Sequence, residues 1–116
     1  MFGLFKGKRS DAARSTAVSP RDARARAESG QILLVDVREA GEWAQMHIPG
    51  AVHAPLSDLA QHLERLPDDR PLIFYCRSGA RSRRAIQICQ QLRLPHDTDI
   101  AGGIVAWRAA GLPIES

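Results

Sequence analysis

Short apolar runs alternate with segments of helical periodicity along most of the chain. The apolar runs cover residues 32–37, 51–54, 72–75 and 99–101. Between them, apolar residues recur with the three-to-four-residue spacing of amphipathic helices. Strands that alternate with helices are typical of crossover units, in which the strands lie parallel. The pattern therefore predicts an α/β fold around a small, mostly parallel sheet.

Capping and turn residues indicate where the helices begin and end. Ser19 and Pro20 suit the N-cap and the first helical position of a helix that reaches residue 28 and ends at Gly30. Ser57 and Asp58 predict a second capped helix that continues to residue 63. Further helices are expected over residues 39–45, from about 80 to 92, and over 104–109.

The positive charge of the chain is concentrated at its N-terminus. The first fourteen residues contain four basic residues and one acidic residue, which equals the net charge of +3 of the whole chain. The remainder is neutral and, within 116 residues, has room for one hydrophobic core. We expect residues 1–16 to form a flexible basic tail, with weak contact to a membrane surface as an alternative. Residues 17–116 are expected to form the single folded domain.

Composition excludes several classes of function. A neutral body without interleaved aromatic residues offers no stripe for nucleic acid, and no apolar run is long enough to cross a bilayer. The two cysteines have neither disulfide nor metal-ligand spacing, which favours a reducing compartment, so we expect a cytoplasmic protein. No metal and no cofactor is expected.

The strongest chemical signal is a cysteine at the end of the apolar run 72–75. Cys76 is followed at once by a polar, glycine-containing loop and then by a helix. Loop amides and the free amides of the first helical turn converge in such an arrangement, with the positive end of the helix dipole behind them. Arg77 and Arg81 add positive charge, so the pKa of the thiol should be low. These features predict that Cys76 is a nucleophile.

The same residues also have structural interpretations. A cysteine that ends a buried strand is often only a small apolar residue, and this interpretation suits Cys89, which lies on the apolar face of a predicted helix. Arg77 and Arg81 could simply face solvent, but their loop position favours recognition of an anion. Trp43 and Trp107 are expected to pack as apolar anchors.

Several motifs resemble those of a known family. They are the segments 36–39 (DVRE), 42–43 (EW), 47–51 (HIPGA), 76–82 (CRSGARS) and 102–107 (GGIVAW). From residue 19 to the C-terminus, their order is similar to that of a single-domain rhodanese, also called a rhodanese homology domain. This resemblance implies a three-layer fold with a central sheet of about five strands flanked by short helices.

The resemblance also implies a thiosulfate sulfurtransferase that works through a persulfide on Cys76. The donor would be a small sulfur-containing anion such as thiosulfate, and the acceptor cyanide or a thiol, possibly a protein thiol. The donor-binding loop would comprise Arg77, Ser78, Gly79, Ala80, Arg81 and Ser82. The small residues of this loop, Ser78, Gly79, Ala80 and Ser82, would act through their backbone amides. Ser82 could also cap the following helix. A monomer or a homodimer is expected.

Four further residues of the motifs are expected to support the site. The family pattern suggests an ion pair between Arg38 and Glu42, with Asp36 accepting hydrogen bonds near the loop. His47 lies in a turn and is expected to be a hydrogen-bonding scaffold residue, because a thiolate that its loop already stabilises needs no general base.

Two other functions remain open. A noncatalytic or relay module could carry sulfur for a protein partner or bind one through this face. A cysteine-dependent phosphatase would place its arginine six residues after the cysteine, whereas Arg81 follows Cys76 by five. The shorter loop suits a sulfur atom better than a tetrahedral phosphate.

Overall fold

A five-stranded parallel sheet forms the centre of the molecule. The computed structural model describes residues 15–116. Its strands are β1 (Thr16–Val18), β2 (Leu33–Asp36), β3 (Val52–His53), β4 (Leu72–Tyr75) and β5 (Thr98–Ile100). They lie in the order β1-β5-β4-β2-β3, and every neighbouring pair is parallel. The predicted α/β architecture and parallel sheet are confirmed.

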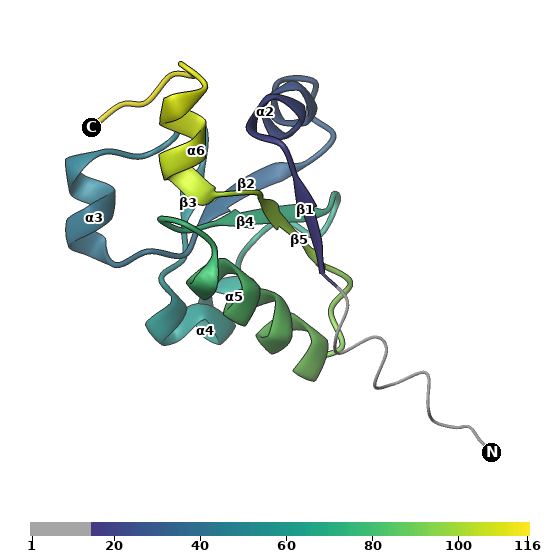
Figure 1. Ribbon diagram of the computed structural model, residues 1–116. Coiled ribbons are helices and arrows are strands. Elements are labelled where there is room, and N and C mark those ends of the chain that lie inside the picture. The colour runs from purple at the N-terminus through teal and green to yellow at the C-terminus, as the bar shows by residue number, and fades with distance from the viewer. Residues whose placement is uncertain (1–14) are drawn as a thin grey trace.

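Helices cover both faces of this sheet (Figure 1). The helices α2 (Pro20–Glu28) and α6 (Gly103–Ala109) lie on one face. The opposite face carries α5 (Ala80–Gln91) and α4 (Leu59–Leu63), which follows the short 3-10 turn η1 (Leu56–Asp58). Helix α3 (Ala40–Gln45) lies beside the sheet rather than over either of its faces. The arrangement has the three layers that the family resemblance implied.

Alternation along the strands divides the core into two apolar layers. On β4, Phe74 packs in the layer with α4 and α5, whereas its neighbours Ile73 and Tyr75 pack in the layer with α2 and α6. Strand β2 divides in the same way, because successive side chains of a strand point to opposite faces. All four residues of β4 are buried, as expected for the central strand of a covered parallel sheet.

The ends of some elements differ from the sequence prediction. Strand β1 was not expected, and it begins at Thr16, one residue before the predicted start of the domain. The expected tail otherwise lies outside the described residues. Ser19 caps α2 as predicted, and its Oγ accepts the N–H of Asp22 at 3.1 Å.

The predicted side-chain cap of the helix that ends at Leu63 is wrong. The turn η1 precedes α4, and Asp58 occupies the N-cap without a side-chain capping hydrogen bond. Its carboxylate lies 3.5 Å from His62 Nε2 instead. The chain enters α4 through a tighter helical turn, so Ser57 lies inside that turn rather than at a cap.

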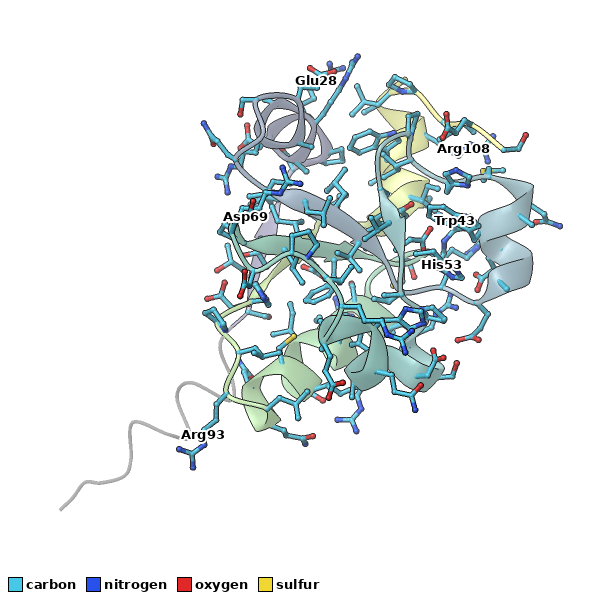
Figure 2. The ribbon with its side chains drawn as sticks, turned by 180° about the vertical axis from the view of Figure 1, so that it is seen from behind. Glu28, Trp43, His53, Asp69, Arg93 and Arg108 are labelled. Carbon is cyan, nitrogen blue, oxygen red and sulfur yellow. The ribbon has the colours of Figure 1, made fainter. Side chains whose placement is uncertain are left out.

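The two tryptophans have different packing roles. Trp107 is buried in α6, and its Nε1–H donates to the Pro113 carbonyl at 2.7 Å. Trp43 lies on α3 and stacks on the rings of His47, at 3.7 Å between centroids, and His53, at 4.9 Å. Figure 2 shows Trp43 and His53 close together beside α3. Both tryptophans make packing contacts, as the sequence predicted.

Within residues 15–116, no helix combines the length and the apolar character needed to span a membrane.

One of the buried hydroxyl groups allows a test of the packing. Tyr75 is fully buried, and its hydroxyl accepts the N–H of the buried residue Ile48 at 3.0 Å. Tyr75→Phe keeps the ring but leaves that amide without its partner. We expect the free energy of unfolding, measured in urea, to fall by about 1–3 kcal/mol.

The matched control removes a hydroxyl from a more exposed hydrogen bond. Thr98 Oγ1 donates to Asp97 Oδ1 at 3.0 Å on the protein surface. Thr98→Val should change the free energy of unfolding by less than about 0.5 kcal/mol. Equal losses in the two variants would contradict the assigned role of the Tyr75 hydroxyl.

Candidate active site

Cys76 lies immediately after β4 at the carboxyl edge of the sheet, where parallel strands commonly present their ligand sites. The residue is buried, with 1% of its surface exposed. Its Sγ accepts the backbone N–H of Gly79 at 3.1 Å and that of Ser82 at 3.4 Å. The strand-loop-helix sequence therefore places the sulfur among amide donors at the N-terminus of α5.

These donors change the ionisation of the thiol. Burial raises the pKa of Cys76, but the backbone amides of Ser82, Gly79 and Arg81, together with the contact to the Ser82 side chain, outweigh it. The net result is a pKa below the ordinary value of a cysteine. The predicted low pKa is supported, although backbone amides contribute more to it than the arginine side chains do.

Cys89 shows the opposite behaviour. It is fully buried in the apolar layer beneath α5, and burial alone raises the pKa of its thiol to about 12. A thiol with such a pKa is protonated at neutral pH and is a poor nucleophile. Its position agrees with the structural interpretation made from the sequence.

Ser82 has a different contact from the one expected. It is the third residue of α5 and fully buried, and its hydroxyl does not cap the helix. Instead Oγ lies 2.6 Å from Asp99 Oδ2 and 3.1 Å from the Gly79 carbonyl. The Cys76 Sγ is 3.7 Å from the same Oγ.

Asp99 is a residue of the site that the sequence analysis did not find. It lies on β5 and is 4% exposed, and burial raises the pKa of its carboxyl group. Its segment was recognised only as an apolar strand. A charged residue within such a strand was the available signal, because a buried aspartate requires a polar partner.

The ion pairs near the loop differ from the expected ones. The predicted pair between Arg38 and Glu42 is wrong. Glu42 binds Arg81 through two hydrogen bonds, of 2.6 and 2.9 Å. Arg38 binds Asp36, with Nη2 at 2.7 Å from Oδ2, and also donates to the Met46 carbonyl at 2.7 Å. Asp36 also accepts the Arg38 amide.

The two ion pairs have different origins, one local and one tertiary. Asp36 and Arg38 flank one residue at the end of β2, so a buried pair forms locally there. Glu42, on the first turn of α3, is left to face Arg81 at the start of α5. Hydrogen bonds from Arg81 lower the pKa of Glu42 to about 2, so the carboxylate is ionised at neutral pH.

The remaining loop residues differ in exposure. Arg77, Ser78 and Ala80 are exposed, whereas Gly79 is buried. Gly79 has a φ of 138°, which favours glycine and turns its amide toward the sulfur. The structure thus brings Cys76, Gly79, Arg81 and Ser82 together, and leaves the Arg77 side chain at the surface.

The His47 ring contacts one residue nearby in the sequence and one that is far from it. Its Nδ1 lies 2.9 Å from the Trp43 carbonyl, and its Nε2 lies 3.2 Å from a carboxylate oxygen of Glu115. The backbone of His47 also pairs with Glu115 in an isolated bridge. These contacts attach the C-terminal segment to the end of α3.

Gly103 lies in the motif 102–107, for which the sequence predicts no role in the site. The amides of Ile104 and Val105 bind the carbonyls of Cys76 and Arg77, at 2.9 and 3.2 Å. An added Cβ at Gly103, where φ is +61°, would collide with both carbonyls. This position therefore permits α6 to approach the cysteine loop closely.

Comparison with known proteins agrees with this geometry. The sequence matches the family model of the rhodanese-like domain over residues 19–110. A sulfurtransferase of Allochromatium vinosum is 40% identical over 88 residues, which cover 76% of this chain and 82% of that protein. The thiosulfate sulfurtransferase GlpE of Vibrio cholerae is 31% identical over 94 residues, covering 81% and 89%.

A solved structure has the same fold. The crystal structure of a thiosulfate sulfurtransferase from Pseudomonas aeruginosa matches this chain with a TM-score of 0.79 and 31% sequence identity. The match covers 89% of this chain but only 20% of that one. The shared fold is therefore one part of a longer protein there.

The Glu42–Arg81 ion pair predicts a pH dependence of stability. Because the pKa of Glu42 is lowered in the folded protein, the pair stabilises at neutral pH and this contribution is lost as the pH falls toward about 2. Both side chains are one-third exposed, at 33%, so solvent screening reduces the effect. Glu42→Gln should lower the free energy of unfolding by about 1 kcal/mol at pH 7.

Urea denaturation of Glu42→Gln and the wild-type protein across acidic pH tests this expectation. The difference between the two proteins should vanish as Glu42 becomes protonated. Glu28→Gln is the control, since Glu28 and Arg24 form an exposed pair on α2. It should cost less than about 0.5 kcal/mol at any pH. A Glu42→Gln effect that does not depend on pH would contradict the assigned ion pair.

Gly103 gives a second test. Gly103→Ala and Gly50→Ala both place a side chain at positive φ, but only the first collides with the cysteine loop, because nothing lies within 4 Å of a Cβ at Gly50. The loss of unfolding free energy should be greater for Gly103→Ala by about 2 kcal/mol. Equal losses of unfolding free energy in the two variants, by thermal or urea unfolding, would show that the cysteine loop can move away from a side chain at residue 103 without destabilising the protein.

Proposed function

The chain belongs to the family of rhodanese-like domains, and we propose that it is a sulfurtransferase in which Cys76 carries sulfur as a persulfide. The observation that carries this proposal is the convergence of loop amides on the buried Cys76 Sγ. Relatives that are named sulfurtransferases support sulfur transfer in general. We propose thiosulfate, or another small anion with a sulfane sulfur, as the donor.

In the first half-reaction, the Cys76 thiolate attacks the outer sulfur of thiosulfate. A bond forms between Sγ and that sulfur, the sulfur–sulfur bond of the donor breaks, and sulfite leaves with the bonding electron pair. The lowered pKa of Cys76 favours the thiolate that makes this attack. The loop amides then face the added sulfur and the charge that it carries.

In the second half-reaction, a cyanide or thiolate acceptor attacks the outer sulfur of the persulfide. The persulfide bond breaks toward Cys76, which leaves as the thiolate that the same amides stabilise. The cycle returns the enzyme to its starting state without a cofactor. Two separate transfers predict ping-pong kinetics.

The surrounding charges support binding of an anionic donor. The exposed Arg77 is the cationic loop side chain most accessible to an incoming anion. Arg81 is held beside the site by Glu42, so its charge is partly neutralised, and we assign it to positioning the loop more than to gripping the donor. Asp36, Arg38, Glu42 and His47 are proposed to support the loop through the contacts described above.

Phosphatase chemistry is a less suitable interpretation of this loop. This loop is similar to that of cysteine-dependent phosphatases, but those enzymes have one more residue between the cysteine and the arginine. In that place this chain has Ser82, which is fully buried and bonded to Asp99. The position that would carry the phosphate-binding guanidinium therefore has no positive charge.

Mass spectrometry tests the proposed intermediate. After incubation with thiosulfate, the protein should gain one sulfur atom on Cys76, and cyanide should remove it as thiocyanate. Cys76→Ala should gain none. Cys89→Ala is the control, because Cys89 is buried away from the loop amides, and this variant should still form the adduct.

The absence of an adduct on folded wild-type protein with thiosulfate and with a persulfide donor would overturn the proposal. An adduct that thiols remove but cyanide does not would favour a relay module over thiosulfate:cyanide transfer. Hydrolysis of an aryl phosphate, with no sulfur transfer, would instead favour phosphatase activity.

A further inference from the structure

Three polar side chains from three consecutive elements of the site form a connected line. Asp99 on β5 lies 2.6 Å from the Ser82 hydroxyl on α5, and that hydroxyl lies 3.7 Å from the Cys76 Sγ after β4. All three residues are buried, with Asp99 4% and Cys76 1% exposed. We infer that Asp99 acts through Ser82 as a positioning residue that shares one proton with Cys76.

Strand pairing explains why these residues meet. Asp99 is the partner of Phe74 in the parallel register between β4 and β5, and residues paired in this way point to the same face of the sheet. Phe74 packs toward α5, so the Asp99 carboxyl also points toward α5. The first turn of that helix places Ser82 between Asp99 and Cys76.

The Ser82 hydroxyl has only one proton to donate. When Asp99 is ionised, the hydroxyl donates to the carboxylate, and its oxygen is then free to accept the S–H of Cys76. When Asp99 is protonated, its O–H donates to Ser82, and the hydroxyl can turn its own proton to the Cys76 thiolate, whose negative charge attracts it more strongly than the neutral Gly79 carbonyl at 3.1 Å does. The protonation state of Asp99 thus decides the direction of the hydrogen bond that reaches the sulfur.

The two arrangements differ by one proton transfer along the line. The S–H bond of Cys76 breaks as its proton passes to Ser82 Oγ, and the former Ser82 proton passes to Asp99 Oδ2. The negative charge moves from the carboxylate to the sulfur, and nothing is oxidised or reduced. Burial, which raises the pKa of Asp99, and the loop amides, which lower that of Cys76, bring the two groups closer in proton affinity.

Other charged groups act on this pair from the surrounding elements. The elements packed against β5 are β1, β4, α5 and α6. Strand β1 contains no titratable side chain, β4 contributes the buried Tyr75, and α6 contributes Arg108, which is exposed. From α5, Arg83 lowers the pKa of Asp99, and Arg81, held by Glu42, interacts with the Cys76 charge. The exposed Asp97 precedes β5 at its other end.

For the proposed sulfur transfer, this arrangement supplies a place for the thiol proton. Cys76 can become a thiolate at a buried site without releasing a proton to solvent, and the thiol can be restored along the same line after the sulfur has left. This inference deepens the proposed function, but its test uses the free protein without any sulfur donor. Failure of sulfur transfer and failure of proton sharing therefore give different results.

The experiment is a titration of the thiolate by its ultraviolet absorbance in wild-type protein and Asp99→Asn. Signal below the pKa of about 12 of Cys89 belongs to Cys76. The single tyrosine, Tyr75, is buried with a raised pKa, so its absorbance does not interfere at neutral pH. The asparagine amide of the variant cannot take up the proton but is similar in size to the aspartate carboxyl group.

We expect the wild-type thiolate to form over two steps, as for a coupled pair, and Asp99→Asn to show one step. The midpoint in Asp99→Asn should be lower by about one pH unit, because the competing negative charge is removed and Ser82 is released to donate to sulfur. In a Ser82→Ala background, the same Asp99→Asn change should shift the midpoint less, because no hydroxyl group then connects residue 99 to Cys76.

Asp97→Asn is the matched control, since it removes the same charge from the exposed residue near β5, and it should leave the titration unchanged. Superimposable curves for wild type and Asp99→Asn, or a midpoint that moves to higher pH, would show that Asp99 only holds Ser82 in place. If Asp99→Asn does not fold, infrared difference spectra of the wild-type protein test whether Asp99 shares the proton. A protonated-carboxyl band should titrate together with the thiolate, and the absence of such a band would overturn the inference.

Discussion

The hydrogen bonds that the chain donates to one sulfur atom are the interaction on which the rest of the site depends. A buried thiolate without donors would be strongly disfavoured, because burial alone raises the pKa of a thiol, as it does at Cys89. At Cys76 the amides of Gly79 and Ser82 reverse that outcome. These amides are available because the loop passes directly from a central strand into a helix, whose first turn leaves them without helical partners.

Two neighbouring elements hold the loop in this shape. On one side, the amides at the start of α6 bind the carbonyls of Cys76 and Arg77, and the absence of a side chain at Gly103 allows the approach. On the other side, Glu42 on α3 binds Arg81 with two hydrogen bonds. Because α6 binds the loop carbonyls from one side, the loop amides on the other side face the sulfur. Cys76 is therefore positioned by the sheet, by α6 and by α3 together.

The buried polar line from Asp99 through Ser82 to Cys76 gives the site a second property. Backbone amides favour a thiolate but cannot take up its proton, whereas a buried carboxyl group can. Asp99 has this ability because it lies in a low-dielectric position between β5 and α5, where its charged form is costly. An apolar residue would suit the same position better if the strand served only to fill the core.

The sequence by itself determined the features that depend on neighbouring residues. The alternation of apolar runs and helices, the Ser19 cap and the strand-loop-helix around Cys76 could all be predicted, because each follows from local periodicity or from a few consecutive side chains. Only the tertiary structure decided that Glu42 binds Arg81, that Asp99 meets Ser82, and that Thr16 begins a strand. These features join residues that are far apart along the chain, and β1 is too short to show a pattern before β5 is beside it. A local pattern states which groups need partners, whereas the packing of the sheet and helices determines which partners they receive.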